Sequence, residues 1–218
     1  MALSSTFRLP RAANADNPLR LAVFISGSGS GMEALLKHQQ NPQCSHTTTI
    51  VVSNVLGVGG LEKAGKYGVK TQVIESAPTL ERIEHEDIIH KVLIHNEIEA
   101  IILSGYMRIL SSNFVNKWEG RLLNIHPSLL PDFPGAHAHR DALKAGVNKS
   151  GCTVHFVDSG VDSGLIISQN TTEVLSHDTI QTLQEKIKKL EHTLYPSVID
   201  AFSEGRLEII DYSRVIIK

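Results

Sequence analysis

Five consecutive apolar residues, Leu21–Ile25, lead directly into the loop Ser26–Gly31, and this junction constrains the fold more than any other feature of the chain. A run that is apolar at every position is typical of a strand buried on both faces, as in a parallel sheet. Further runs typical of strands follow at Thr48–Val52, Thr71–Ile74 and Ala100–Leu103, with helical patterns between them. Strands that alternate with helices indicate right-handed βαβ units. We therefore predict an α/β fold with a mostly parallel, twisted sheet.

After residue 150 the alternation gives way to a pair of strands. The runs Cys152–Val157 and Leu165–Thr172 flank a turn rich in glycine and aspartate, which is typical of an antiparallel hairpin added to the sheet. No repeat or linker interrupts the order, so we predict a single domain over residues 21–218. Its helices are predicted at about 61–67, 79–97 and, as a long C-terminal helix, 179–205.

Residues 1–20 precede the first predicted strand. They carry Arg8, Arg11 and Arg20 but a single acidic residue. We expect an N-terminal extension that is a disordered tail. A transit peptide is the alternative, although the segment lacks an amphipathic period.

The composition excludes several classes of protein. The 218 residues carry a formal charge of −2, with no basic stripe for nucleic acid and no apolar run of the ~20 residues that a membrane helix needs. The two cysteines, Cys44 and Cys152, are far apart, which suits a reducing compartment and predicts neither a disulfide framework nor a zinc site. We expect a cytoplasmic protein without a metal. Most of the eleven histidines stand among polar residues and are expected at the surface, namely His38, His46, His85, His90, His95 and His177.

The loop Ser26–Gly31 joins a strand to a helix, where backbone N–H groups and the helix dipole favour a phosphate. No Gly-Lys-Ser/Thr follows, so the loop is not a P-loop. Met32 stands at the third glycine position of the dinucleotide fingerprint, and the second strand ends in Asn54 rather than an acidic residue. The sequence thus favours a single phosphate over a dinucleotide. A glycine-rich turn that only permits close packing is the alternative.

Asn124 and His126 end the predicted strand at 121–125. They point to the same side because strand side chains alternate, and ligands of open α/β sheets bind at this end of the strands. An amide can donate to an oxygen that is becoming negative, and an imidazole can carry a proton near pH 7. Pro127 and Pro131 stiffen the loop that follows. A capped strand end without chemistry is the alternative reading of the pair.

Three other stretches have side chains suited to a site. Asp162, in the turn between the two hairpin strands, is placed to pair with His126 and raise its pKa, although Asp158 fits the role of a turn aspartate at least as well. The stretch 105–110 mixes aromatic, Met, Arg and aliphatic residues that suit a flat heteroaromatic ligand. His137 and His139 form an H-x-H pair, for which we favour substrate contact or a structural role over metal.

In order and spacing these stretches resemble the phosphoribosylglycinamide formyltransferase family, which transfers a formyl group in purine biosynthesis. The resemblance covers roughly residues 20–208. It rests on Ile25–Ser30, Gly105–Leu110, Leu122–Pro131, Val161–Gly164 and Glu191–Pro196.

The resemblance implies a formyltransferase-type Rossmann-like fold, with a nucleotide-binding half at about 21–120 and a folate and catalytic half at about 121–210. Its substrates would be glycinamide ribonucleotide and 10-formyltetrahydrofolate, with no nucleic acid or membrane partner, and it would be a monomer or homodimer. The amine would attack the formyl carbon through a tetrahedral intermediate. Asn124 and protonated His126 would donate to the oxyanion, and Asp162 would keep the imidazole charged. The phosphate and ribose would be held by Gly29, Ser30, Gly31, Lys188 and Glu191, and the folate by Arg82, Met107, Arg108, Ile109, Leu110 and backbone near 158–162.

Two residues depart from the family pattern. Gly31 stands where an asparagine is usual, and Asp132 occupies a loop position that is usually neutral or basic. The first predicts a raised KM for the ribonucleotide relative to Gly31→Asn, and the second would weaken binding unless Asp132 faces solvent. The rival functions are a formyltetrahydrofolate deformylase, with water as acceptor, and a non-catalytic nucleotide or folate binder. The Asn-x-His-Pro motif is shared with methionyl-tRNA formyltransferase, but this chain lacks room for a tRNA-binding domain.

Overall fold

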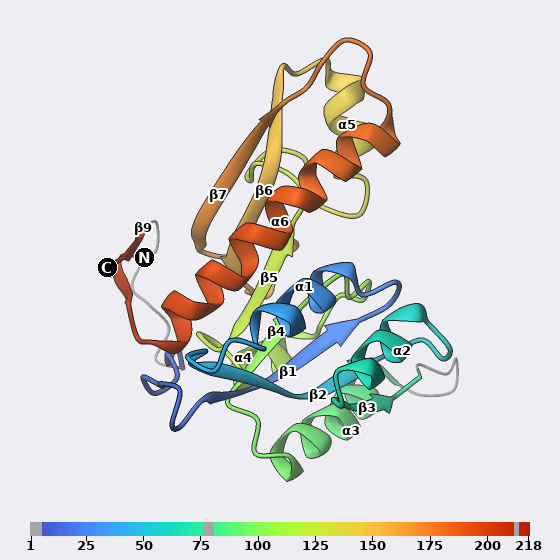
Figure 1. The fold of residues 1–218 in the computed structure, drawn as a ribbon. Helices are drawn as coiled ribbons and strands as arrows, with labels where there is room; N and C mark the ends of the chain where they lie inside the picture. Colours follow the sequence, from blue (N-terminus) through green and yellow to red (C-terminus); the bar gives the residue numbers. More distant parts are fainter. Residues whose placement is uncertain (1–5, 76–80, 212–213) are drawn as a thin grey trace.

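The computed structural model describes residues 6–75, 81–211 and 214–218, and the fold is a twisted sheet covered by helices (Figure 1). Seven strands lie in the order β3-β2-β1-β4-β5-β6-β7. The first five of these pair in parallel, while β6 runs antiparallel to β5 and to β7. The predicted α/β class and the added antiparallel hairpin are confirmed.

The described strands and helices have these bounds. The strands are β1 (Leu19–Ile25), β2 (His46–Ser53), β3 (Lys70–Val73), β4 (Ala100–Leu103), β5 (Leu122–His126), β6 (Lys149–Phe156), β7 (Ile166–Glu173), β8 (Leu207–Asp211) and β9 (Arg214–Ile217). The helices are α1 (Ser30–His38), α2 (Gly59–Lys66), α3 (Arg82–His95), α4 (Ser112–Lys117), α5 (Ala138–Ala145) and α6 (Ile180–Ser203). The predicted start of the helix at 79–97, which corresponds to α3, lies outside the described residues.

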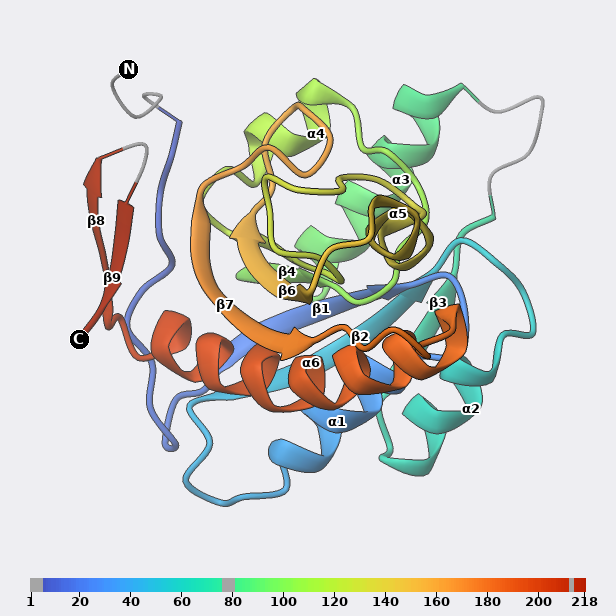
Figure 2. The same cartoon turned by 90° about the horizontal axis from the view of Figure 1, so that it is seen from above.

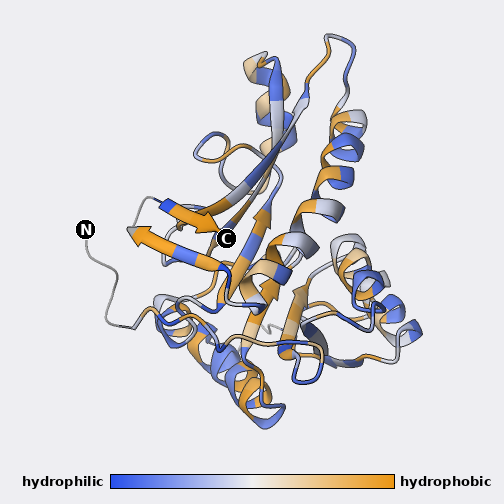
Figure 3. Cartoon of the chain, turned by 60° about the vertical axis from the view of Figure 1, so that its left-hand side comes forward, coloured by the Kyte–Doolittle hydropathy of each residue, from blue (hydrophilic) through white to orange (hydrophobic). Residues whose placement is uncertain are grey.

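Successive residues of β1 feed two separate cores, as the alternation of strand side chains requires. Leu21, Val23 and Ile25 pack on the side of α1 and α6, while Ala22 and Phe24 pack with residues of α3 and α4. All five are fully buried, which is why the run is apolar at every position. Figure 3 shows the strands of the sheet as largely hydrophobic and the helices as mixed.

The strand order reverses between β1 and β4, because β2 lies on one side of β1 and β4 on the other. The loops after these two strands therefore part in opposite directions, and a crevice opens at their carboxyl ends. Seen from above, α6 runs along the sheet, crossing β1 and β2 (Figure 2). The buried Tyr195 of α6 donates its hydroxyl to the backbone oxygens of Leu103 and Leu123, at 2.9 and 3.1 Å. This fixes α6 beside the ends of β4 and β5.

The expectation of a disordered extension is wrong for residues 6–18, which pack against the domain. Arg11 forms an ion pair with Glu99 at 2.7 Å, and Phe7 contacts the ring of Phe156 with centroids 5.2 Å apart. The amide of Ala13 also donates to a backbone oxygen at the end of α6. The composition of the segment concealed this because its contacts are to residues distant in sequence. Residues 1–5 lie outside the described part.

Sequence patterns also missed several elements. The short helices α4 and α5 and the hairpin of β8 and β9 were not predicted, since each is too short for a period to stand out. Two histidines expected at the surface, His46 and His85, are buried. Across the described ranges, no helix is both long enough and apolar enough to span a membrane.

Candidate active site

A pocket of about 710 Å³ opens at the carboxyl ends of the parallel strands. Five parts of the chain line most of it: the loop 26–31 after β1, the loop 104–110 after β4, the end of β5, the segment 135–139, and the turn 157–162 between β6 and β7. Gln184, Lys188 and Glu191 of α6 close one side. The switch point of the sheet and the hairpin turn thus meet in one cavity.

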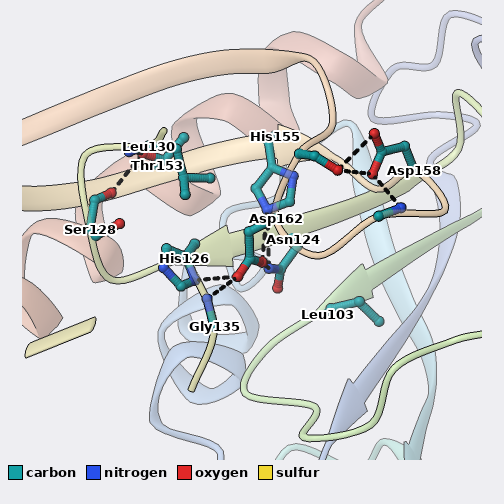
Figure 4. A network of polar contacts seen from close by, with 12 residues as sticks. Leu103, Asn124, His126, Ser128, Leu130, Gly135, Thr153, His155, Asp158 and Asp162 are labelled. Atoms are coloured by element: carbon teal, nitrogen blue, oxygen red, sulfur yellow. Dashed lines mark hydrogen bonds and ion pairs between the residues drawn. The ribbon is translucent and has the colours of Figure 1, made fainter. Parts of the chain in front are cut away.

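Asn124, His126 and Asp162 come together in this pocket (Figure 4). The Asp162 carboxylate lies with Oδ2 3.2 Å from Nδ1 of His126, and its Oδ1 accepts from Nδ2 of Asn124 at 3.4 Å. The amide of Gly135 donates to Oδ2 at 2.8 Å. The contact between Asp162 and His126 is therefore direct, and the predicted same-side projection of Asn124 and His126 is confirmed.

Asp158 takes the alternative role that the sequence left open for the turn aspartates. Its Oδ1 accepts from the amide of Gly160 at 3.0 Å and from the hydroxyl of Ser163 at 2.9 Å, so it binds its own turn. Asp162 has a φ of 51°, a left-handed conformation that is uncommon for a residue with a side chain. Such strain gathers at functional positions. With this backbone conformation, the carboxylate of Asp162 points toward Asn124 and His126 of β5.

The pKa of Asp162 lies at about 2. Burial by itself raises the pKa, but His155, whose Nε2 lies 3.7 Å from Oδ1 and can donate to it only when protonated, the Gly135 amide and the charge of His126 lower it further than burial raises it. The carboxylate is therefore ionised at neutral pH, as expected.

Burial lowers the pKa of His126 below its ordinary value, although the carbonyl of Phe133 and the charge of Asp162 both act to raise it. The expectation of an imidazole kept charged by Asp162 is wrong in its net direction, because desolvation outweighs the ion pair. Both ring nitrogens nevertheless face acceptors, with Nε2 2.9 Å from the oxygen of Phe133. A neutral ring can donate to only one of these two acceptors. If His126 gains a proton, both ring nitrogens can donate, one to Asp162 and one to Phe133.

His155 is a member of this network that the sequence analysis missed. It lies on β6 directly opposite Asn124 in the antiparallel register, a relation that only the paired strands reveal. Its Nδ1 lies 2.8 Å from the oxygen of Phe156 and must donate to it, so Nε2 of the neutral ring is an acceptor. Nδ2 of Asn124 lies 3.2 Å from that Nε2. The two amide hydrogens of Asn124 are thus directed at His155 and Asp162, and its Oδ1 makes no hydrogen bond to a described residue.

The loop 26–31, for which we predict phosphate binding and which is called the phosphate loop below, has the backbone of a close turn before a helix. Gly29, with a φ of 63°, precedes the first residue of α1, and a Cβ at Gly29 would lie 2.8 Å from Cα of Gly60. A glycine is therefore required at position 29. The amides of the first helical turn, from Ser30 onward, have no partner within the helix. Gly29, Ser30 and Gly31 all line the pocket, as predicted.

Lys188 and Glu191 project from α6 into the same pocket. Burial raises the pKa of Glu191 to about 7, and the charge of Lys188 opposes this. His139 also lines the pocket, and burial, followed by the nearby charges of His126 and Lys188, lowers its pKa. The carboxyl of Glu191 therefore changes charge near neutrality.

The loop 105–110 lines the opposite part of the pocket, with Met107, Arg108, Ile109 and Leu110 as predicted. Met107 and Ile109 are exposed despite being apolar. The loop is tied to β1, because the amide of Met107 donates to the Ser26 hydroxyl at 2.8 Å. The phosphate loop and the apolar loop therefore hold each other in place.

Two predicted site residues are not brought to the pocket. Arg82 begins α3 and His137 precedes α5, and the described residues that line the pocket include neither. Asp132 is exposed and is not among the described residues that line the pocket, so it faces solvent, the case in which we expect no effect on binding.

A comparison with known proteins shows the class of protein to which this chain belongs. A family model described as formyl transferase matches residues 19–199, most of the chain. The chain is 38% identical to phosphoribosylglycinamide formyltransferase of Escherichia coli over 192 residues, covering 88% of this chain and 90% of that protein. The solved glycinamide ribonucleotide transformylase 1 of Symbiobacterium toebii superposes with a TM-score of 0.88 at 39% identity, covering 92% of this chain and 94% of that one. The chain belongs to the phosphoribosylglycinamide formyltransferase family.

Longer relatives contain the same domain. The trifunctional purine biosynthetic protein adenosine-3 of Gallus gallus is 43% identical over 199 residues, which are 91% of this chain and 20% of that protein. This chain thus spans about a fifth or less of the length of the trifunctional relatives that it matches.

Proposed function

We propose that this protein transfers the formyl group of 10-formyltetrahydrofolate to the amine of glycinamide ribonucleotide. The observation that carries the proposal is the joint placement of Asn124, His126 and Asp162 in one pocket with the loop at Gly29–Gly31. Family membership supports the same reaction.

The substrate positions follow from the chemistry of the pocket walls. The phosphate of the ribonucleotide would bind the free amides at the start of α1, assisted by Lys188. The ribose hydroxyls would reach Glu191, and the pterin would lie against the loop 105–110, whose exposed apolar side chains need a cover. These positions direct the amine and the formyl carbon to the polar trio between them.

The reaction forms one C–N bond and breaks another. The amine attacks the formyl carbon, a tetrahedral intermediate with an oxyanion forms, and the bond to N10 breaks as a proton from the amine passes to N10. Because His126 is neutral in the free protein, it can take up the amine proton, and Asp162 stabilises the resulting imidazolium. Nε2 of His126 can reach the substrate only if the carbonyl of Phe133, 2.9 Å away, moves out of hydrogen-bonding distance.

Asn124 can act either as a hydrogen-bond acceptor or as a donor toward the substrate, depending on which end of its amide faces His155 and Asp162. With both amide hydrogens on His155 and Asp162, it offers Oδ1 and would orient the attacking amine. To donate to the oxyanion the amide must turn over, and His155 must then carry a proton on Nε2 to hold Oδ1. We propose the first role for the approach of the amine and the second for the intermediate, when a proton is available.

The remaining expectations stay predictions. A monomer or homodimer is expected, and size-exclusion chromatography with light scattering tests it. A cytoplasmic location is supported by two free thiols, Cys44 and Cys152, and fractionation of cells tests it. The two functional halves, 21–120 and 121–210, also remain a proposal.

The test is the absorbance change on loss of the formyl group from a 10-formyl folate, with and without glycinamide ribonucleotide. Loss that requires the ribonucleotide supports the transferase. Loss without it supports the deformylase, and no loss in either case supports a binding protein.

A further inference from the structure

Away from the pocket, four side chains with metal-binding atoms meet between α1, β2 and α6. They are His38 at the end of α1, Cys44 in the following loop, His46 at the start of β2, and Asp200 on α6. One nitrogen, sulfur or oxygen atom from each lies within 4.8 Å of all the others. No residue of this cluster lines the active-site pocket, so its role is independent of the proposed reaction.

The two oxygens of Asp200 have different surroundings. Oδ1 lies 3.0 Å from Nε2 of the buried His46 and 3.0 Å from Nε2 of His38, while Oδ2 lies 2.9 Å from Nε2 of His38 alone. The side chain of His38 is 33% exposed and that of His46 is 0% exposed. One side of the carboxylate is therefore held from the interior, and the other faces a partly open side.

Neighbouring bonds fix the state of His46. The amide of Thr48 donates to Oε1 of Gln39 at 3.1 Å, which orients the Gln39 side chain. Its Nε2 then lies 2.9 Å from Nδ1 of His46 and must donate to it. The neutral ring consequently carries its hydrogen on Nε2 and donates it to Oδ1 of Asp200. His46 is thus unsuited to bind a metal through Nε2, but well suited to orient a carboxylate that does.

We propose that this cluster is a Zn²⁺ site, with Nε2 of His38, Sγ of Cys44 and Oδ2 of Asp200 as ligands and His46 as the positioning residue behind the carboxylate. Imidazole, thiolate and carboxylate are the ligands that Zn²⁺ takes in proteins, and three of them leave a fourth position for water. Carboxylate ligands of metals are in turn hydrogen-bonded by neighbouring residues, and His46 would fill that role for Asp200.

The spacing of the ligand atoms, within 4.8 Å of one another, is near that of a tetrahedral site. Ligands of tetrahedral Zn²⁺, at ~2.0–2.3 Å from the ion, lie about 3.3–3.8 Å apart. The contact between His38 and Asp200, at 2.9 Å, is a hydrogen bond that the ion would replace by opening it by a few tenths of an ångström. The thiol proton of Cys44, which now faces the oxygen of His46 at 3.3 Å, would be released to solvent on binding.

The site would fasten the C-terminal part of α6 to the α1–β2 connection. Bound Zn²⁺ would raise the midpoint of thermal unfolding, because it binds the folded state and not a chain in which Asp200 is far from Cys44. Activity needs no part in this test, so its failure would leave the proposed reaction untouched.

The experiment titrates untagged, chelator-treated full-length protein with Co²⁺ and then with Zn²⁺. We expect one equivalent of Co²⁺ to produce a thiolate-to-cobalt charge-transfer band and the visible bands of a tetrahedral ion, and Zn²⁺ to abolish both. Cys44→Ser should remove the charge-transfer band, and His38→Gln should weaken binding. His46→Leu should weaken it by ~10–100-fold, the usual effect of losing a supporting residue.

Two control variants locate the metal. Cys152→Ala removes the other thiol, and His139→Gln breaks the H-x-H pair, and both should leave the cobalt spectrum unchanged. The proposal is overturned if the wild type shows no stoichiometric binding, if the band survives in Cys44→Ser, or if either control abolishes it.

Discussion

Nδ1 of His126 lies 3.2 Å from Oδ2 of Asp162, and this contact joins the end of β5 to a turn that follows it by more than thirty residues. The same carboxylate reaches Asn124 and the amide of Gly135. Loss of the negative charge should therefore disturb each polar group that the proposed reaction uses.

Asp162→Asn keeps the size of the side chain and removes its charge. We expect kcat for formyl transfer to fall by ~10²–10⁴, because the imidazolium formed on His126 loses its counter-charge. KM for both substrates should change far less. Steady-state kinetics measures both, with Asp141→Asn on α5, a half-buried aspartate outside the pocket, as the matched control. A variant with near wild-type kcat would remove Asp162 from the proposed mechanism.

The pKa of Asp162 itself can be measured. A carboxyl whose pKa is lowered from 3.8 to about 2 contributes stability that is present above its unfolded value and lost as the pH falls through the folded one. The shift corresponds to about 2 kcal/mol. The carboxyl ¹³C resonance that disappears in Asp162→Asn should show no titration above about pH 3. A midpoint near 4 would contradict the hydrogen-bonded environment described above.

Glu191 should make the protein less stable as the pH rises. Its folded pKa of about 7 exceeds the ordinary value of 4.5, so its stabilising contribution is present at low pH and is lost between these values. The glutamine of Glu191→Gln cannot ionise, so this variant should be more stable than wild type at pH 7.5. At pH 5, which is only ~0.5 above the ordinary pKa of a glutamate, the difference in the free energy of unfolding should be much smaller. Urea unfolding at both pH values gives the comparison. An equal difference at the two values would mean that Glu191 is not buried as a neutral acid.

His155 offers a pair of variants for the orientation of Asn124. His155→Gln retains an acceptor for the Asn124 amide, whereas His155→Leu removes it. We expect kcat to fall by up to about tenfold in the leucine variant, the rate equivalent of one hydrogen bond, and less in the glutamine variant.

A double-mutant cycle separates this effect from a general loss of packing. If His155 acts through Asn124, His155→Leu should have little further effect in an Asn124→Ala background. Additive losses would show that the two residues act separately.

Gly31 tests the departure from the family pattern. Gly31→Asn should lower KM for the ribonucleotide by adding a donor beside the phosphate. A Cβ at this position would lie 2.8 Å from Oγ of Ser104, so that hydroxyl must rotate away first. The gain should be larger in the Gly31→Asn/Ser104→Ala double variant, with Ser104→Ala alone as control. An unchanged KM in both would show that the asparagine is dispensable here.

Much of the fold could be predicted because burial leaves its mark on short windows of sequence. The run at 21–25 is apolar throughout because β1 is covered on both faces, and Leu183 and Ile187 recur at helical spacing because one side of α6 is buried. The approximate positions of Asn124, His126, Asp162 and the phosphate loop follow from where such strands end. The family resemblance assigned their roles.

Tertiary structure alone decided which of these residues touch. The register that sets His155 opposite Asn124 depends on the pairing of distant strands, and the packing of residues 6–18 depends on partners such as Glu99. The net pKa of His126 likewise depends on how deeply the folded chain buries it. Sequence by itself determines which local structures and chemical groups are available, because these depend on neighbours along the chain. Contacts, burial and charge states depend on neighbours in space, which exist only once the sheet has formed.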